Sequence, residues 1–307
     1  MNSILPTIPF RTGAAKNASG FTIIEMVMAI LISGIMAIGI IDYIADSVEG
    51  MSSSSRRSEL GSSGQIALDR MALELHNALP NSIRTTAVAS GDQCLEFVPI
   101  RGVTSYLDAP FTGGGSDTFD VVDFDPSQEG TSGGYAVIYP DDIDDIYDGE
   151  NATTSGFPDR GPIEEIDTIE DTASPSDAST ITLVEDHRFN RRSSQQRFFL
   201  VDQPVSFCVK ADKLYRYSNY GFYNMQPEDE EETGVCEVGM GDTCLPNYTV
   251  APDKMLITNN VDNDGLTAFT VSPQSLQRNA LISFVFRFTD GPDSVDINHE
   301  TLTRSVP

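Results

Sequence analysis

One carboxylate stands at the edge of the most apolar stretch of the chain. Glu25 follows Gly20-Phe21-Thr22-Ile23-Ile24 and precedes Met26–Ile41, a run of 16 uncharged residues. An ionised side chain costs roughly 2.5–3.5 kcal/mol at the centre of a bilayer, and less near the interface. Such a residue normally has a partner, so Glu25 is the first candidate functional residue.

Four cysteines, Cys94, Cys208, Cys236 and Cys244, are the next candidates, and they allow three pairings. If the chain is exported, disulfides are expected in an oxidising compartment. Cys236 and Cys244 flank a short glycine-containing stretch that suits a small closed loop, which would leave Cys94 with Cys208. A zinc site is the alternative, but no Cys-x-x-Cys pair is present and the chain has only three histidines.

Two further motifs offer only weak signals. Asn260–Gly265 resembles the start of a calcium loop through Asp262 and Asp264, but Val271 stands where an EF-hand needs an acid. We therefore expect a turn between two strands and no metal, with Asp262 and Asp264 as weak calcium candidates. Residues 130–134 match Gly-x-Ser-x-Gly without the strand–turn–helix context of a hydrolase. Neither an enzyme nor a cofactor is expected.

An apolar run of this length needs either a membrane that surrounds it or an export system that recognises it. Phe21–Ile41 contains 21 residues, about 30 Å as a helix and enough to cross a bilayer core. Arg11 and Lys16 precede it, which predicts a cytoplasmic N-terminus and an exported remainder. A cleaved signal peptide and a plain membrane anchor are alternatives, but neither accounts for Glu25.

Gly20-Phe21-Thr22-Ile23-Ile24-Glu25 resembles the processing site of type IV pilins and type II secretion pseudopilins. The resemblance implies a leader at residues 1–20, longer than is usual, that prepilin peptidase removes after Gly20. It also implies N-methylation of Phe21 and pairing of Glu25 with the terminal amine of a neighbouring subunit. An amine and a carboxylate, both costly in lipid, can offset each other between packed helices.

A second, amphipathic helical stretch is predicted after the membrane segment, so that the helix covers residues 21–79. Glycines and serines between residues 50 and 64 weaken it, since glycine costs about 1 kcal/mol in a helix interior. One face carries apolar residues at helical spacing and should pack on the chain's own sheet, with helix–helix packing in a filament core as the alternative. These residues are Leu68, Met71, Ala72, Leu75 and Leu79.

The remainder, residues 80–307, should form a β-rich head. The candidate strands are Cys94–Pro99, Phe119–Phe124, Tyr135–Tyr139, Ile181–Val184, Arg197–Val201, Val205–Lys210, Leu214–Tyr217, Met255–Thr258, Leu266–Val271 and Ala280–Phe288. Val205–Lys210 and Leu214–Tyr217 suggest a hairpin. The Phe284, Phe286 and Phe288 face of the last strand is expected to point inward.

Charge patterning separates the head into acidic and basic regions. Residues 140–180 contain 13 acids and one arginine, and both this stretch and residues 228–232 read as acidic loops. Arg188, Arg191, Arg192 and Arg197 form a basic island, for which pairing with the chain's own acids is favoured over contact with another subunit. The net charge of −27 argues against nucleic-acid binding.

Scattered phrases in the head resemble a narrower group, the MshO-type minor pilins of the MSHA pilus, which are related to PilW and GspJ. They are 79–84, 94–100, 204–208, 214–217 and 298–307. The fold class expected is α+β and pilin-like, with a long N-terminal helix packed on an antiparallel β-rich head.

The resemblance implies a structural minor pilin in the bacterial inner membrane, with its head in the periplasm, and later in the pilus. Its implied partners are other pilin and minor pilin subunits, prepilin peptidase/methylase and the inner-membrane assembly machinery. A tip adhesin, a type II secretion pseudopilin and a membrane-anchored hydrolase are the alternatives.

Overall fold

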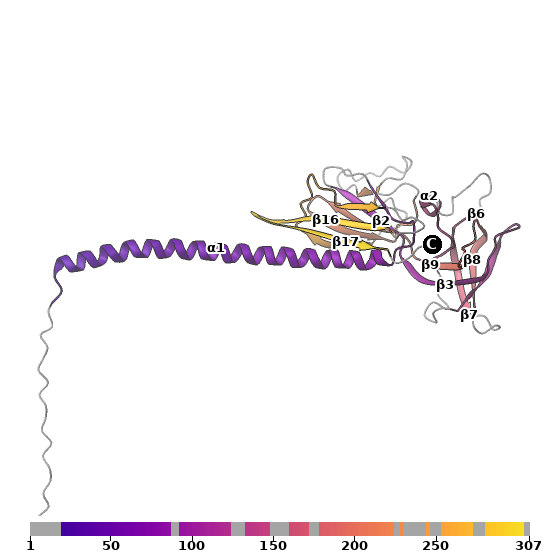
Figure 1. Ribbon diagram of the computed structural model, residues 1–307, viewed down its shortest axis with the longest axis horizontal. Helices are drawn as coiled ribbons and strands as arrows, with labels where there is room; N and C mark the ends of the chain where they lie inside the picture. Colours follow the sequence, from indigo (N-terminus) through magenta and orange to yellow (C-terminus); the bar gives the residue numbers. More distant parts are fainter. Residues whose placement is uncertain are drawn as a thin grey trace, which may run out of the picture. The chain divides into compact units, whose positions relative to one another are not determined.

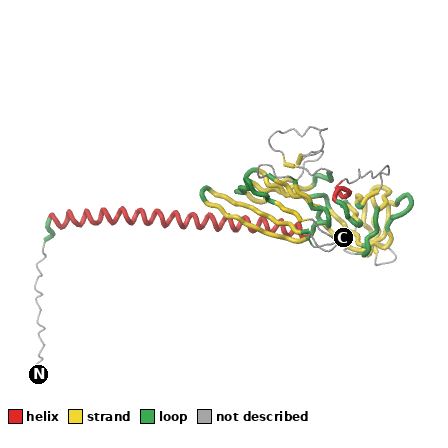
Figure 2. The backbone as a smooth tube through the Cα atoms, turned by 45° about the horizontal axis from the view of Figure 1, so that its top comes forward, coloured by secondary structure: helices red, strands yellow, loops and turns green. Residues whose placement is uncertain are grey.

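The computed structural model describes residues 20–86, 92–123, 133–147, 160–171, 178–223, 228–229, 244–245, 253–272 and 280–303. The chain divides after Ser54 into two compact units. The first contains the N-terminal part of helix α1 (Ile23–His76), and the second contains its remainder and all of the strands. Figure 2 shows the helix as one uninterrupted red element, so the glycines and serines between residues 50 and 64 do not break it.

The second half of α1 has a buried face, as the spacing of its apolar residues predicts. The buried positions of α1 recur at helical spacing; they are Leu60, Gly64, Ala67, Leu68, Met71 and Leu75. Leu79, which the pattern also includes, is buried but lies just beyond the helix. In Figure 1 the strands β2, β16 and β17 flank this half of the helix.

Two antiparallel sheets enclose this face of α1. The five-stranded sheet has the order β1-β2-β10-β11-β14, and the three-stranded sheet has the order β15-β16-β17. Their strands are β1 (Arg84–Thr85), β2 (Gln93–Phe97), β10 (Val205–Lys210), β11 (Lys213–Ser218), β14 (Asp253–Asn259), β15 (Phe269–Ser272), β16 (Leu281–Asp290) and β17 (Asp293–Leu302). The β10–β11 hairpin is confirmed, with Ala211 and Asp212 in its turn. Phe284, Phe286 and Phe288 are fully buried in the shared core, so the inward aromatic face is confirmed as well.

A third sheet closes on itself. Strands β3, β4, β8, β7, β5 and β9 pair in a ring, because β4 pairs with β8 as well as with β3, and β6 adds to β8 outside the ring. The strands are β3 (Ile100–Asp108), β4 (Ser116–Val122), β5 (Tyr135–Val137), β6 (Arg160–Gly161), β7 (Ile163–Asp171), β8 (Ala178–Phe189) and β9 (Arg197–Val201). Closure removes the free edges of a sheet and encloses a second core, around Phe119, Phe189 and Phe198.

The prediction that residues 140–180 form an acidic loop is wrong over much of their described length. Helix α2 (Ile143–Tyr147) and strands β6 and β7 occupy them, and β8 begins at Ala178. Strand β7 buries Ile163, Ile166 and Ile169, whereas Glu164 and Glu165 are half-buried and Asp167 and Glu170 are exposed. In the second acidic segment β12 (Glu228–Asp229) pairs with β13 (Cys244–Leu245), and residues 230–232 lie outside the described residues.

A third cluster of buried side chains joins α2 to the barrel and to the end of α1. Ile146 and Tyr147 of α2 pack with Leu79 and with Phe199 of β9. The head is therefore an antiparallel β-rich body built partly around a helix, and the α+β, pilin-like fold expected from the sequence is confirmed.

Candidate functional site

The start of α1 places the residues of the apolar motif. The Thr22 carbonyl accepts hydrogen bonds from the backbone N–H groups of Glu25 and Met26, each at 3.1 Å. The Thr22 hydroxyl oxygen also accepts from the Glu25 N–H at 3.3 Å, so Thr22 is the N-cap. Glu25 consequently lies in the first turn, where a negative charge interacts favourably with the helix dipole.

The side chains around this cap are exposed. Phe21 is 80% exposed and Ile23 is 86% exposed, and exposure of large apolar side chains continues along α1 to Met51. Within the described residues, no hydrogen bond or ion pair reaches the Glu25 carboxylate. The helix is long and apolar enough to cross a membrane. An apolar surface of this extent on a water-soluble chain would be an aggregation site, so it requires lipid or protein around it.

Gly20 has no packing reason of its own to be glycine. A Cβ built at Gly20 meets none of the described atoms within 4 Å, and its φ lies outside the left-handed region. By contrast, a Cβ at Gly64 would come within 2.5 Å of the Phe288 ring. The helix needs a glycine at position 64, whereas nothing within the described fold requires one at position 20.

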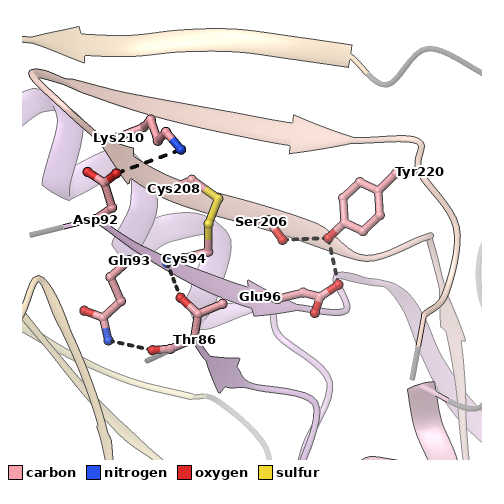
Figure 3. The surroundings of a disulfide bond; sticks show 9 residues. All are labelled: Thr86, Asp92, Gln93, Cys94, Glu96, Ser206, Cys208, Lys210 and Tyr220. Carbon is pink, nitrogen blue, oxygen red and sulfur yellow. Dashed lines mark hydrogen bonds and ion pairs between the residues drawn. A yellow bond between two sulfur atoms is a disulfide. The ribbon is translucent and has the colours of Figure 1, made fainter. Parts of the chain in front are cut away.

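Cys94 and Cys208 form a disulfide between directly opposed residues of β2 and β10 (Figure 3). Tyr217 and Tyr220 pack against it, and both cysteines are buried. Cys236 lies outside the described residues, and the side chain of Cys244 is not described.

Glu96, two residues along β2 from this bridge, carries a buried polar network that sequence reasoning missed. Arg84 donates to its carboxylate at 2.6 Å, and the Tyr220 hydroxyl donates to it at 2.9 Å. Ser206 contacts the same tyrosine hydroxyl, as Figure 3 shows. Burial raises the pKa of Glu96 above its usual value, although Arg84 acts in the opposite direction.

The pKa values of two tyrosines in this region are raised. Burial, reinforced by the charge of Glu96, raises the pKa of Tyr220 and that of Tyr147 well above 10. Arg84 lies 3.6 Å above the Tyr147 ring, and the Tyr147 hydroxyl donates to the Ser82 carbonyl at 2.6 Å. The available signal was a glutamate between the apolar residues Leu95 and Phe97 of a predicted strand. The network is structural, since it links β1, β2, β10 and α2.

The basic island makes contacts within the head, and the expected pairing with the chain's own acids is seen for Arg191. Arg191 pairs with Asp141, Arg188 donates to the Gly113 carbonyl at 3.3 Å, and Arg192 lies 4.8 Å above the Phe111 ring. Arg197 begins β9.

Asp262 and Asp264 are exposed on a turn between β14 and β15, as the preferred interpretation predicts. Asn263 between them is buried: its amide donates to the Val285 carbonyl at 3.0 Å, and its oxygen accepts from the Arg287 N–H at 3.1 Å. The loop is thus tied to β16 by the asparagine. Across the described ranges, no group of three or more His, Cys, Asp or Glu side chains is placed to hold a metal ion.

Comparison with known proteins finds a likeness at the N-terminus. Residues 15–41 match the prokaryotic N-terminal methylation motif, which includes Gly20, Phe21 and Glu25. No curated protein and no solved structure matches the chain. The motif supports a type IV pilin-like protein, a structural class, that prepilin peptidase processes and that assembles with other pilins. Together with the apolar helix, the match fits anchoring in the inner membrane followed by incorporation into a pilus.

Proposed function

We propose that the chain is a structural minor pilin of an MSHA-type pilus, which acts in assembly of the filament or at its tip. Prepilin peptidase cuts after Gly20, and Phe21 becomes the N-methylated first residue. The N-terminus faces the cytoplasm before cleavage, and the head lies in the periplasm. The partners are other pilin and minor pilin subunits and the inner-membrane assembly machinery.

The observation that carries this proposal is the geometry of the helix start. Thr22 caps α1 directly after Gly20 and Phe21, so the scissile bond would lie outside the helix and remain open to a peptidase. Gly20 packs against none of the described atoms, so a requirement for glycine there must come from outside the fold. A peptidase that admits no side chain at the residue before the cut would supply that requirement.

Glu25 then serves as the assembly carboxylate. Its side chain has no partner among the described residues, and it lies one helical turn from Phe21. In lipid both an unpaired carboxylate and an unpaired ammonium are costly, so pairing between neighbouring subunits would favour insertion of a new subunit. Contacts between apolar helices in the filament would replace the lipid contacts of residues 21–51.

Determination of the mature N-terminus tests the proposal. The chain is purified from the membrane fraction, and its intact mass and terminal sequence are measured. A start at N-methyl-Phe21 is expected. An intact Met1 would leave a plain membrane anchor, and a start beyond the apolar run would leave a secreted domain; either result excludes the pilin role. A Gly20→Ala chain and a Gly61→Ala chain serve as a matched pair, and only the first should alter processing.

The alternatives differ in where the head acts. A type II secretion pseudopilin would have the same N-terminus but would not appear in sheared pili. A ligand-binding head on the same scaffold is favoured by one observation, a polar cleft on the barrel wall lined by one arginine of the basic island.

A further inference from the structure

The barrel carries a cleft of about 390 Å³ where β3, β4 and β8 meet the segment that connects β3 to β4. Its volume falls within the range of small-molecule sites. The polar residues that line it are Asp108, Thr112, Ser116, Thr118, Asp120, Thr180 and Arg192. We propose that this cleft binds a neutral sugar ring. The inference gives a ligand class to the second candidate function and does not depend on the assembly role.

The wall of the cleft is shaped by two breaks in the strand register. One interrupts the β3–β4 pairing between Tyr106 and Asp108, and the other interrupts the β4–β8 pairing between Ser116 and Thr118. Such irregularities redirect side chains and are frequent beside binding sites. The connecting segment is fixed against β8, because Gly115 has a φ of +94° and a Cβ there would come within 3.0 Å of the His187 carbonyl oxygen. The rim of the cleft therefore packs closely against β8.

The polar groups of the cleft retain unused hydrogen-bonding capacity. Within the described part of the chain, no hydrogen bond or ion pair reaches the side chains of Asp108 or Thr112. Asp120 accepts one bond, from the Thr180 hydroxyl at 2.9 Å, which leaves its other oxygen available. Arg192 lies 4.8 Å over the Phe111 ring, so the aromatic face supports the guanidinium.

This set of groups selects among ligand classes. Two carboxylates in a chain of net charge −27 disfavour an anion. A divalent cation needs several convergent carboxylates, but Arg192 adds a positive charge, and no group of three or more His, Cys, Asp or Glu among the described residues is placed to hold a metal ion. A sugar hydroxyl both donates and accepts, and the cleft offers acceptors, a donor and hydroxyls that do both. A neutral polyhydroxylated ring therefore fits the cleft best.

Saturation-transfer NMR on the full chain tests the proposal, in a zwitterionic detergent whose headgroup is not a sugar. The probes are glucose, galactose and N-acetylglucosamine, with choline and inorganic phosphate as charged comparisons. At least one sugar should bind, and neither charged probe should compete with it. No saturation transfer to any sugar, or equal binding of choline or phosphate, would overturn the proposal.

Matched variants locate the binding. Asp108→Asn and Thr118→Val each remove acceptor or hydroxyl capacity with little change in size, and each should weaken sugar binding about tenfold. Thr182→Val is the control, because Thr182 pairs with Thr118 across β4 and β8 but does not line the cleft. Unchanged far-UV circular dichroism in every variant would exclude misfolding as the cause. A control variant that loses binding as strongly as the cleft variants would place the sugar elsewhere and refute the site.

Discussion

Arg56 and Asp293 are 237 positions apart in the sequence and form an ion pair of 2.7 Å between α1 and the start of β17. At the other end of the same strand, the His76 ring contacts the Leu302 carbonyl at 3.2 Å. The two ends match in length, because 20 residues of helix and nine of strand each span about 30 Å. Strand β17 therefore follows the buried half of α1 along its length.

Gly64 of α1 packs against the β16–β17 hairpin, and it gives the first prediction. A Cβ at this position would lie 2.5 Å from the Phe288 ring and 2.6 Å from the Ile297 terminal methyl carbon. Gly64→Ala should lower the free energy of unfolding by about 1–3 kcal/mol through overpacking, despite the better helix propensity of alanine.

The matched control is Gly61→Ala, one turn earlier, where a Cβ meets nothing within 4 Å. It should raise stability by about 0.5–1 kcal/mol. Thermal unfolding of the full chain in detergent, followed by far-UV circular dichroism, compares the two. If both changes stabilise the chain, the close approach at Gly64 does not exist in solution.

The disulfide gives the second prediction. Cys94 and Cys208 are 114 residues apart, and cross-linking a loop of that size restricts the unfolded chain strongly. Replacement of both cysteines by alanine should cost about 2–5 kcal/mol of unfolding free energy. The double variant is the right comparison, because a single change leaves a reactive thiol. A midpoint of thermal unfolding that does not move would show that the bridge adds nothing to the fold.

The buried carboxylate gives the third prediction, through its pH dependence. Burial raises the pKa of Glu96, so the folded head binds this proton more tightly than the unfolded chain does. The stability that the protonated group contributes is fully present below the usual value near 4.5, and it is lost as the pH rises through the folded-state pKa. Wild type should therefore gain stability relative to Glu96→Gln when the pH falls from 7 to 4.

Urea unfolding of both chains at several pH values measures this difference. Glu170→Gln, on the exposed side of β7, gives the background effect of removing one carboxylate. If the wild-type advantage instead grows toward pH 7, the ion pair with Arg84 outweighs the desolvation of Glu96.

Whether a strand can be predicted from the sequence depends on whether its apolar residues recur at every second position. Strand β16 has phenylalanine at every second position, and its face and its place in the sequence were predicted correctly. Strand β7 was missed because its isoleucines are three apart, at 163, 166 and 169. A register shift between Ile166 and Thr168 places both Ile166 and Ile169 in the barrel core, whereas Ile163 packs in the cluster that contains α2, and this spacing resembles no regular strand pattern.

Strand β17 was missed for a different reason. Val295 and Ile297 are its apolar contacts with the core, and polar residues fill most other positions. Closure of the third sheet into a ring could not be predicted from local sequence patterns either. It depends on the pairing of β3 with β9 and of β4 with β8, which are far apart in the chain. The helix start depends on local interactions alone, because Thr22 and Glu25 are three residues apart: the helix was expected from residue 21 and begins at Ile23, and the cap at Thr22 was not predicted.

The fourth prediction separates two roles that Glu25 could have. Its first-turn position would stabilise the helix through the dipole, by about 0.3–1 kcal/mol, whether or not subunits assemble. Pairing with the Phe21 amine of a neighbouring subunit requires the negative charge and matters only during assembly. We expect Glu25→Gln and Glu25→Ala to be cleaved and to remain in the membrane, yet to be nearly absent from sheared pili, as immunoblots of the two fractions would show.

Thr22→Ala is the matched control, because it removes the hydroxyl cap at a cost of about 1 kcal/mol and leaves the charge in place. It should enter pili at close to the wild-type level. Charge pairing predicts that loss of the carboxylate is far more harmful than loss of the cap. Helix stabilisation alone predicts that the two are comparable, so wild-type incorporation of Glu25→Gln would contradict the pairing role of Glu25.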